Sequence, residues 1–123
     1  MKKTQTVLIV EDEIALLEVL SDKLKNNGFG VLIAKNGEEG LKLIEHQKPD
    51  LVLLDILMPR MDGVTMLRHL RDEMKNKVPV IVLTNLGSTD NAREAKELGA
   101  DDFLIKADHS LDEVVSKVRS HLK

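Results

Sequence analysis

The chain has 123 residues, of which 42% are hydrophobic and 32% charged, and this size suits one domain with one core rather than two. Its 18 Lys and Arg nearly balance its 21 Asp and Glu, so the formal net charge of -3 lacks the basic excess expected of a nucleic-acid-binding domain. With no cysteine, the chain forms neither a disulfide framework nor a thiolate metal site.

Membrane and targeting signals are not evident in the sequence. No apolar stretch approaches the ~20 residues of a membrane-spanning helix, and residues 1–3 lead into a strand-like segment rather than a signal peptide. We therefore expect a cytoplasmic protein that binds neither membranes nor nucleic acid directly. We also expect residues 1–123 to form a single domain, ordered from about residue 5 to residue 122, without an output domain.

Short apolar runs alternate with longer amphipathic segments, which predicts five strands in strict alternation with five helices. The first helix should carry one apolar face and end near Gly28; that face comprises Ile14, Leu17, Leu20 and Leu24. Asn36, followed three residues later by Glu39, is a capping signal for a second helix that runs to about His46.

The remaining helices are predicted in the second half of the chain. A turn at residues 62–63 leads into a third helix, whose inner side should comprise Val64, Leu67, Leu70 or Arg71, and Met74. A fourth helix, at about 90–98, should be the most weakly held because it buries mainly small side chains. Ser110 and Glu113 form a capping box for a fifth helix, with an apolar stripe of Leu111, Val114, Val115, Val118 and Leu122.

The apolar runs themselves indicate a parallel sheet. They occupy residues 7–10, 31–34, 51–54, 80–83 and 103–105, and they are wholly apolar, as strands covered by helices on both faces are. Right-handed crossovers would place helices on both faces of the sheet. We therefore predict an α/β fold of the flavodoxin-like (βα)5 type, whose strand order 2-1-3-4-5 has its switch point between the first and third strands.

Side chains suited to phosphoryl chemistry follow four of these five runs. Glu11 and Asp12 follow the first, Asp55 the third, Thr84 the fourth and Lys106 the fifth, so all should meet at the carboxyl edge of the sheet. Three carboxylates at close range repel one another unless a cation bridges them or one holds a proton, and Mg²⁺ prefers oxygen ligands. With a lysine charge and a threonine hydroxyl for phosphoryl oxygens, the set suits in-line phosphoryl transfer.

Residues 54–63, together with the acidic pair, Thr84 and Lys106 in this order and spacing, resemble the response-regulator receiver domains of two-component signalling. The resemblance covers essentially the whole chain. It implies that Asp55 accepts a phosphoryl group from a sensor histidine kinase or phosphotransfer protein. Mg²⁺ or Mn²⁺ would be held by Asp12, Asp55 and the backbone carbonyl of Leu57.

The resemblance also implies how the switch works. Glu11 would act on the metal through a bound water, Thr84 would turn toward the phosphoryl group, and Phe103 would move inward behind it. The fourth helix, fifth strand and fifth helix would then present a changed surface to a downstream protein or a fused output domain. The implied function is a signalling switch and not an enzyme, apart from self-phosphorylation from phosphodonors and autodephosphorylation.

The sequence departs from the commonest pattern of this family at three positions. Glu11 replaces the more frequent Asp, Asn85 stands where a small residue is usual, and Ala107 stands where proline is usual. A cis bond before alanine would cost roughly 3 to 4 kcal/mol, so we predict a trans bond between Lys106 and Ala107, or a strained cis bond held by the site. Leu57 and Asn85 flank the site and should set the phosphate lifetime by screening attacking water.

Other interpretations stay open. A degenerate receiver that binds partners without phosphorylation would account for Asn85 and Ala107, although the intact acidic, Thr and Lys set argues against it. A small phosphatase or mutase similar to the haloacid dehalogenases would use Asp55 as its nucleophile, but needs a second Asp where Leu57 stands. A flavin or dinucleotide site is weaker, because no Ser/Thr-rich or Gly-x-Gly-x-x-Gly loop follows the first strand.

Simpler roles compete at single positions. Phe103, one of two aromatic residues, is by default a core side chain at a sheet edge. The charges of Glu11 and Asp12 favour the N-terminus of the following helix by ~0.3 to 1 kcal/mol, and this role can coexist with metal binding. The four histidines fall outside the strand-end cluster and are interpreted as surface residues.

Overall fold

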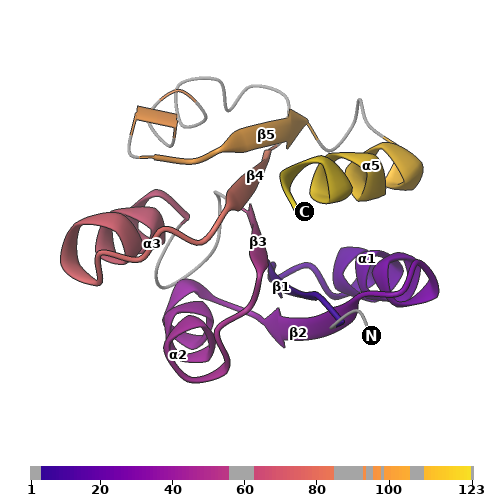
Figure 1. Ribbon diagram of the computed structural model, residues 1–123, viewed down its shortest axis with the longest axis horizontal. Coiled ribbons are helices and arrows are strands. Elements are labelled where there is room, and N and C mark those ends of the chain that lie inside the picture. Colours follow the sequence, from indigo (N-terminus) through magenta and orange to yellow (C-terminus); the bar gives the residue numbers. More distant parts are fainter. Residues whose placement is uncertain are drawn as a thin grey trace.

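The computed structural model describes residues 4–55, 63–84, 93, 96–97, 99–105 and 110–122, and of residue 84 only the backbone. Five parallel strands form one sheet of order β2-β1-β3-β4-β5, with helices on both faces (Figure 1). The predicted fold class and strand order are therefore confirmed. The elements are β1 (Thr6–Val10), α1 (Ile14–Asn26), β2 (Gly30–Ala34), α2 (Gly37–Gln47), β3 (Leu51–Asp55), α3 (Gly63–Arg68), η1 (His69–Glu73), β4 (Val80–Thr84), β5 (Asp102–Ile105) and α5 (Leu111–His121).

The sheet separates two apolar cores, because successive residues of a strand point to opposite faces. One core packs α1 and α5 against alternate strand residues; its strand members are Val7, Ile9, Leu51, Leu53, Ile81, Leu83 and Leu104. The other packs α2 and α3 against Leu8, Val10, Val52, Leu54, Val80 and Val82. Figure 1 shows α1 and α5 on one side of the sheet and α2 and α3 on the other. Burial on both faces explains why the strands read as continuous apolar runs.

Helix α1 confirms most of the predicted apolar face. Leu17, Leu20 and Leu24 are buried, but Ile14 is 58% exposed and belongs to neither core. Ile14 is the first residue of the helix, and helical periodicity does not indicate how far the covering elements extend along it. At the other end Gly28 adopts a φ of 91°, the left-handed conformation predicted for it.

Helix α2 begins as predicted and packs closely. The Asn36 side chain caps it by accepting a hydrogen bond of 3.0 Å from the Glu39 N–H. A Cβ at Gly40 would lie only 2.9 Å from Met66 Cε and 3.0 Å from Val10 Cγ2. The glycine therefore lets α2 approach both the sheet and α3.

Helix α3 continues into the π-helical turn η1, which sequence periodicity did not indicate. Of the predicted inner positions Leu67 and Leu70 are fully buried, while Val64 and Met74 are partly buried. Arg71, the alternative to Leu70, instead points out of the apolar core and enters a polar network. A π-helical turn contains one residue more than an α-helical turn, so it changes the direction in which every later side chain points. Arg71 lies within this turn.

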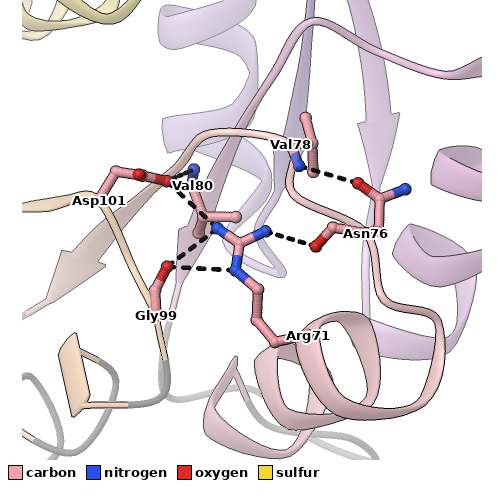
Figure 2. Close-up of polar contacts among 6 residues, drawn as sticks. All are labelled: Arg71, Asn76, Val78, Val80, Gly99 and Asp101. Atoms are coloured by element: carbon pink, nitrogen blue, oxygen red, sulfur yellow. Dashed lines mark hydrogen bonds and ion pairs between the residues drawn. The ribbon is translucent and has the colours of Figure 1, made fainter.

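The Arg71 network joins segments that are far apart in sequence (Figure 2). The guanidinium donates to the carbonyl oxygen of Gly99 from Nε at 3.2 Å and Nη2 at 2.9 Å, and from Nη1 to that of Asn76 at 2.9 Å. Nη2 also lies 3.2 Å from Asp101 Oδ2, which accepts the Val80 N–H at 2.8 Å. One side chain thus ties the end of η1 to the starts of β4 and β5.

Helix α5 has the predicted capping box, with reciprocal hydrogen bonds between Ser110 and Glu113. Its apolar stripe faces the core; Val114, Val115 and Val118 are buried, and Leu111 and Leu122 partly buried. Most of the predicted fourth helix, at about 90–98, lies outside the described residues. The three of its residues that are described, 93, 96 and 97, are helical. None of the helices that the structure describes has the length and apolarity needed to cross a bilayer.

Candidate functional site

Three carboxylates meet at the carboxyl edge of the sheet. β1 and β3 are adjacent and in register, with Val10 opposite Leu54, so the residues that follow these two positions lie side by side. Carboxylate oxygens of Glu11, Asp12 and Asp55 all lie within 4.8 Å of one another. The sequence prediction that these groups converge is confirmed.

Asp55 occupies the middle of this edge. It is the last residue of β3, pairs with Leu83 of β4 on one side, and faces the end of β1 on the other. Its side chain is buried, as is that of Glu11, whereas Asp12 is exposed. A carboxylate on a buried central strand is held rigidly, while Asp12 keeps one side of the cluster open to solvent.

The cluster is electrostatically costly without a counter-charge. At a separation of 4.8 Å, two unit charges repel by about 3.5 kcal/mol at an effective dielectric constant of about 20. A hard divalent cation removes this repulsion, and carboxylate oxygens are the ligands that Mg²⁺ prefers. The donor set of Glu11, Asp12 and Asp55 therefore fits such an ion.

Glu11 also makes local contacts that the sequence did not indicate. Its backbone N–H donates to the Ala34 carbonyl at 3.0 Å, which extends the pairing of β1 and β2 by one residue. Its carboxylate folds back, and Oε2 accepts the N–H groups of Asp12 at 3.1 Å and Glu13 at 3.2 Å. A glutamate two residues before a helix N-cap was the available signal for this contact.

The other predicted site residues are described only in part. Thr84 ends β4 and pairs with Ile105 of β5, so its backbone lies at the expected edge. Its side chain lies outside the described residues, as do Leu57, Asn85, Lys106 and Ala107 in full. Their assigned roles, the predicted trans peptide bond and the effects on phosphate lifetime therefore stay predictions.

Phe103 does not lie in either apolar core. Its side chain is 39% exposed on β5, which is an edge strand. The next residue, Leu104, is buried against α5, so Phe103 points to the opposite face of the sheet. The default interpretation of Phe103 as a core side chain is wrong, because its side chain is exposed and belongs to neither apolar core.

A second charged group lies at the opposite end of β5. Asp102 Oδ2 is 3.2 Å from Lys117 Nζ and 3.0 Å from His121 Nε2, and Oδ1 accepts the Phe103 N–H at 2.9 Å. Burial raises the pKa of Asp102, but the hydrogen bonds from His121, Phe103 and Lys117 and the charge of Lys117 outweigh it and hold the pKa below its ordinary value. His121 is thus a half-buried partner of β5 rather than a simple surface residue.

Comparison with known proteins decides the family. The family model described as the response regulator receiver domain matches residues 7–119. The chain belongs to this family. Two-component signalling is the setting in which such receiver domains act, and both the predicted family and its fold are confirmed.

This receiver domain is similar to parts of longer regulators. It is 38% identical over 117 residues to the probable transcriptional regulator ycf27 of Cyanophora paradoxa, covering 95% of this chain and 48% of that protein. It is equally similar to the response regulator MprA of Mycobacterium sp. (strain KMS), of which it covers 50%. The receiver domain thus spans about half the length of the curated relatives it matches.

A solved structure gives the same picture of the fold. The receiver domain of the Francisella response regulator 1452 is 33% identical to this one and superposes with a TM-score of 0.88, covering 96% of both chains. The two chains therefore share the receiver fold over nearly their whole length.

Proposed function

We propose that this receiver domain accepts a phosphoryl group on Asp55, in the presence of Mg²⁺ or Mn²⁺, and thereby changes a surface that a partner recognises. The observation that carries the proposal is the convergence of Glu11, Asp12 and Asp55 within 4.8 Å at the carboxyl edge of a parallel sheet. Such an edge is where open α/β sheets bind ligands.

Asp55 is the nucleophile of the proposed reaction. One of its carboxylate oxygens forms a bond to phosphorus while the P–N bond of a donor phosphohistidine breaks, and the electron pair and a proton return to the donor imidazole. When bound, the divalent cation supplies positive charge that lets a phosphoryl dianion approach a carboxylate. Asp12, Asp55 and the Leu57 carbonyl would hold it, with Glu11 acting through a bound water.

Lys106 and Thr84 complete the proposed set. Thr84 ends β4 and pairs with Ile105 of β5, and Lys106 is the next residue after Ile105. This placement supports contacts from the Lys106 ammonium and the Thr84 hydroxyl to the phosphoryl oxygens. Phe103, which is partly exposed on β5, would then move inward, and the surface around β5 and α5 would report the change.

The proposed partners follow from the family and the relatives. A sensor histidine kinase or phosphotransfer protein would supply the phosphoryl group. The relatives named as transcriptional regulators suggest an output in transcription, through a fused domain or a separate protein, while this domain itself would not bind nucleic acid.

The test is intact mass spectrometry after incubation with acetyl phosphate and Mg²⁺. We expect a gain of roughly 80 Da, one phosphoryl group, that disappears in Asp55→Asn and in metal-free samples. Asp72→Asn, which changes an exposed aspartate on η1, should label like the parent. If the parent gains no mass and does not bind beryllium fluoride, the domain is a binding module that works without phosphorylation.

A further inference from the structure

The connection between β1 and α1 is held by the side chain of one residue, Glu11. Its backbone is fixed at the sheet by the 3.0 Å hydrogen bond to Ala34. Its Oε2 accepts two N–H groups of the three-residue connector 11–13, from Asp12 at 3.1 Å and from Glu13 at 3.2 Å. The first residue of the connector thereby fixes the backbone of the next two residues to the end of β1.

The usual capping contact of a helix does not hold this connector. Glu13 is the N-cap residue of α1, yet its side chain makes no capping hydrogen bond, and the first turn of α1 contains no acidic residue. Glu13 and Asp12 are both exposed, whereas the Glu11 side chain is fully buried. The buried carboxylate thus does for the connector what an N-cap side chain does for a helix.

We propose that Glu11 is a positioning residue for Asp12, and that it acts through the backbone N–H groups of Asp12 and Glu13 as well as through its charge. By holding the Asp12 backbone, it aims the exposed Asp12 carboxylate at Asp55. This inference rests on the proposed metal-dependent function. Part of the effect of Glu11 on metal affinity would then come from its hydrogen bonds. An uncharged side chain that accepts the same hydrogen bonds would supply that part as well.

The proposal has a general physical basis. Groups that orient a metal ligand through hydrogen bonds commonly change metal affinity by about 10- to 100-fold when they are removed. Asp12 is exposed and lies between β1 and α1, so neither strand pairing nor helical hydrogen bonds fix its backbone N–H. The extra methylene of glutamate allows the carboxylate to turn back over two successive N–H groups while one oxygen stays within 4.8 Å of the other carboxylates.

Substitutions separate the two contributions of Glu11. Glu11→Gln keeps the length and an oxygen that accepts both N–H groups, but removes the charge. Glu11→Met keeps the approximate length and removes both the charge and the acceptor. Glu13→Gln is the matched control, because it removes one nearby carboxylate charge without touching the hydrogen bonds of Glu11.

Metal affinity is measured by titrating Mg²⁺ calorimetrically into the phosphate-free protein. We expect Glu11→Gln to bind within a few-fold of the Glu13→Gln control, and Glu11→Met to bind about tenfold more weakly than Glu11→Gln. Equal weakening by Glu11→Gln and Glu11→Met would overturn the proposal, because both variants lose the same charge.

Amide hydrogen exchange of the metal-free protein, followed by NMR, gives a second measurement. It requires no metal, and it tests the proposal on the parent protein even if the variants do not fold. The first N–H groups of a helix have no intrahelical partner, so Ile14 and Ala15 serve as internal references. In the parent we expect the Asp12 and Glu13 amides to exchange at least tenfold more slowly than these references, and to lose that protection in Glu11→Met. Equal exchange of all four amides in the parent overturns the proposal.

The two failures are distinguishable. A parent that shows protected Asp12 and Glu13 amides but binds no Mg²⁺ contradicts the proposed metal-dependent function and leaves Glu11 as a purely local anchor. A parent that binds Mg²⁺ and shows unprotected amides retains the function and contradicts the positioning role.

Discussion

At the scale of single residues, carboxylates lie at both ends of the sheet. Glu11, Asp12 and Asp55 crowd together at the carboxyl edge, where their charges repel. Asp102, at the start of β5, instead faces Lys117 and His121 of α5. Repulsion within the cluster favours an incoming cation, whereas the donors around Asp102 stabilise its ionised form without any ligand.

The lowered pKa of Asp102 predicts a loss of stability in acid. A carboxyl group whose pKa is lower in the folded state stabilises the fold above its ordinary pKa of about 3.9, and this stabilisation is lost as the pH falls through the folded-state pKa. We expect Asp102→Asn to lower the free energy of unfolding by about 1 kcal/mol at pH 7, with the difference from the parent shrinking as the pH falls below about 3.9.

Urea unfolding followed by far-ultraviolet circular dichroism measures this difference between pH 7 and pH 3. The chain has no tryptophan or tyrosine, so fluorescence is not a useful probe. Asp22→Asn, which changes an exposed aspartate of α1, should stay parallel to the parent at every pH. A difference for Asp102→Asn that is constant over the whole range would contradict the assignment.

At the scale of elements, Arg71 fastens η1 to the starts of β4 and β5. Burial lowers the pKa of its guanidinium and the charge of Asp101 raises it in part, and an arginine stays charged at neutral pH in either case. A Cβ at Gly99, where φ is 107°, would lie 3.2 Å from Arg71 Nε, so the glycine lets the two segments approach (Figure 2). The planar fork of arginine is what lets one side chain serve Gly99, Asn76 and Asp101 together.

Removing this fork should destabilise the domain. We expect Arg71→Met to lower the free energy of unfolding by about 2 kcal/mol, because the carbonyls of Gly99 and Asn76 and the Asp101 carboxylate lose a charged donor. Arg71→Lys should show most of this loss, since one ammonium cannot reach all three acceptors. Lys77→Met, at an exposed position, should stay within about 0.5 kcal/mol of the parent in urea unfolding. A fully stable Arg71→Lys would show that charge alone suffices.

At the scale of the whole molecule, the acidic site is assembled from the ends of two paired strands that are far apart in the sequence. Glu11 and Asp12 follow β1 and Asp55 ends β3, so the site exists only while the central strands are paired. A ligand that binds only the folded state stabilises it by mass action. Metal binding should therefore be visible as added stability, independently of any phosphodonor.

We expect Mg²⁺ at 100 times its dissociation constant to raise the free energy of unfolding by about 2.7 kcal/mol. Asp12→Asn should remove most of this gain, and Asp22→Asn should retain it. Thermal unfolding followed by circular dichroism, with and without Mg²⁺ at constant ionic strength, provides the measurement. An equal gain in both variants would mean that the ion acts elsewhere on the protein.

The amino-acid sequence was enough to predict the elements whose signals are local. Apolar runs marked the strands because both faces of the sheet are covered, and Asn36, Ser110 and Gly28 marked helix ends through contacts within a few residues. It also brought Glu11, Asp12 and Asp55 together, because parallel strands share one carboxyl edge. That step needed only the strand order, which the connection rules restrict.

What covers each face of an element, and which group a long side chain reaches, depends on how the elements pack. Ile14 has the periodicity of a buried residue but is 58% exposed, and Phe103 lies in an apolar strand but is 39% exposed. Arg71 and Gly99, which are in contact, are 28 positions apart in the sequence. Asp102 and His121 of α5 are 19 positions apart. Periodicity reports the direction of a side chain within its own element, whereas burial and pairing depend on where other elements stop, and only the folded chain sets that.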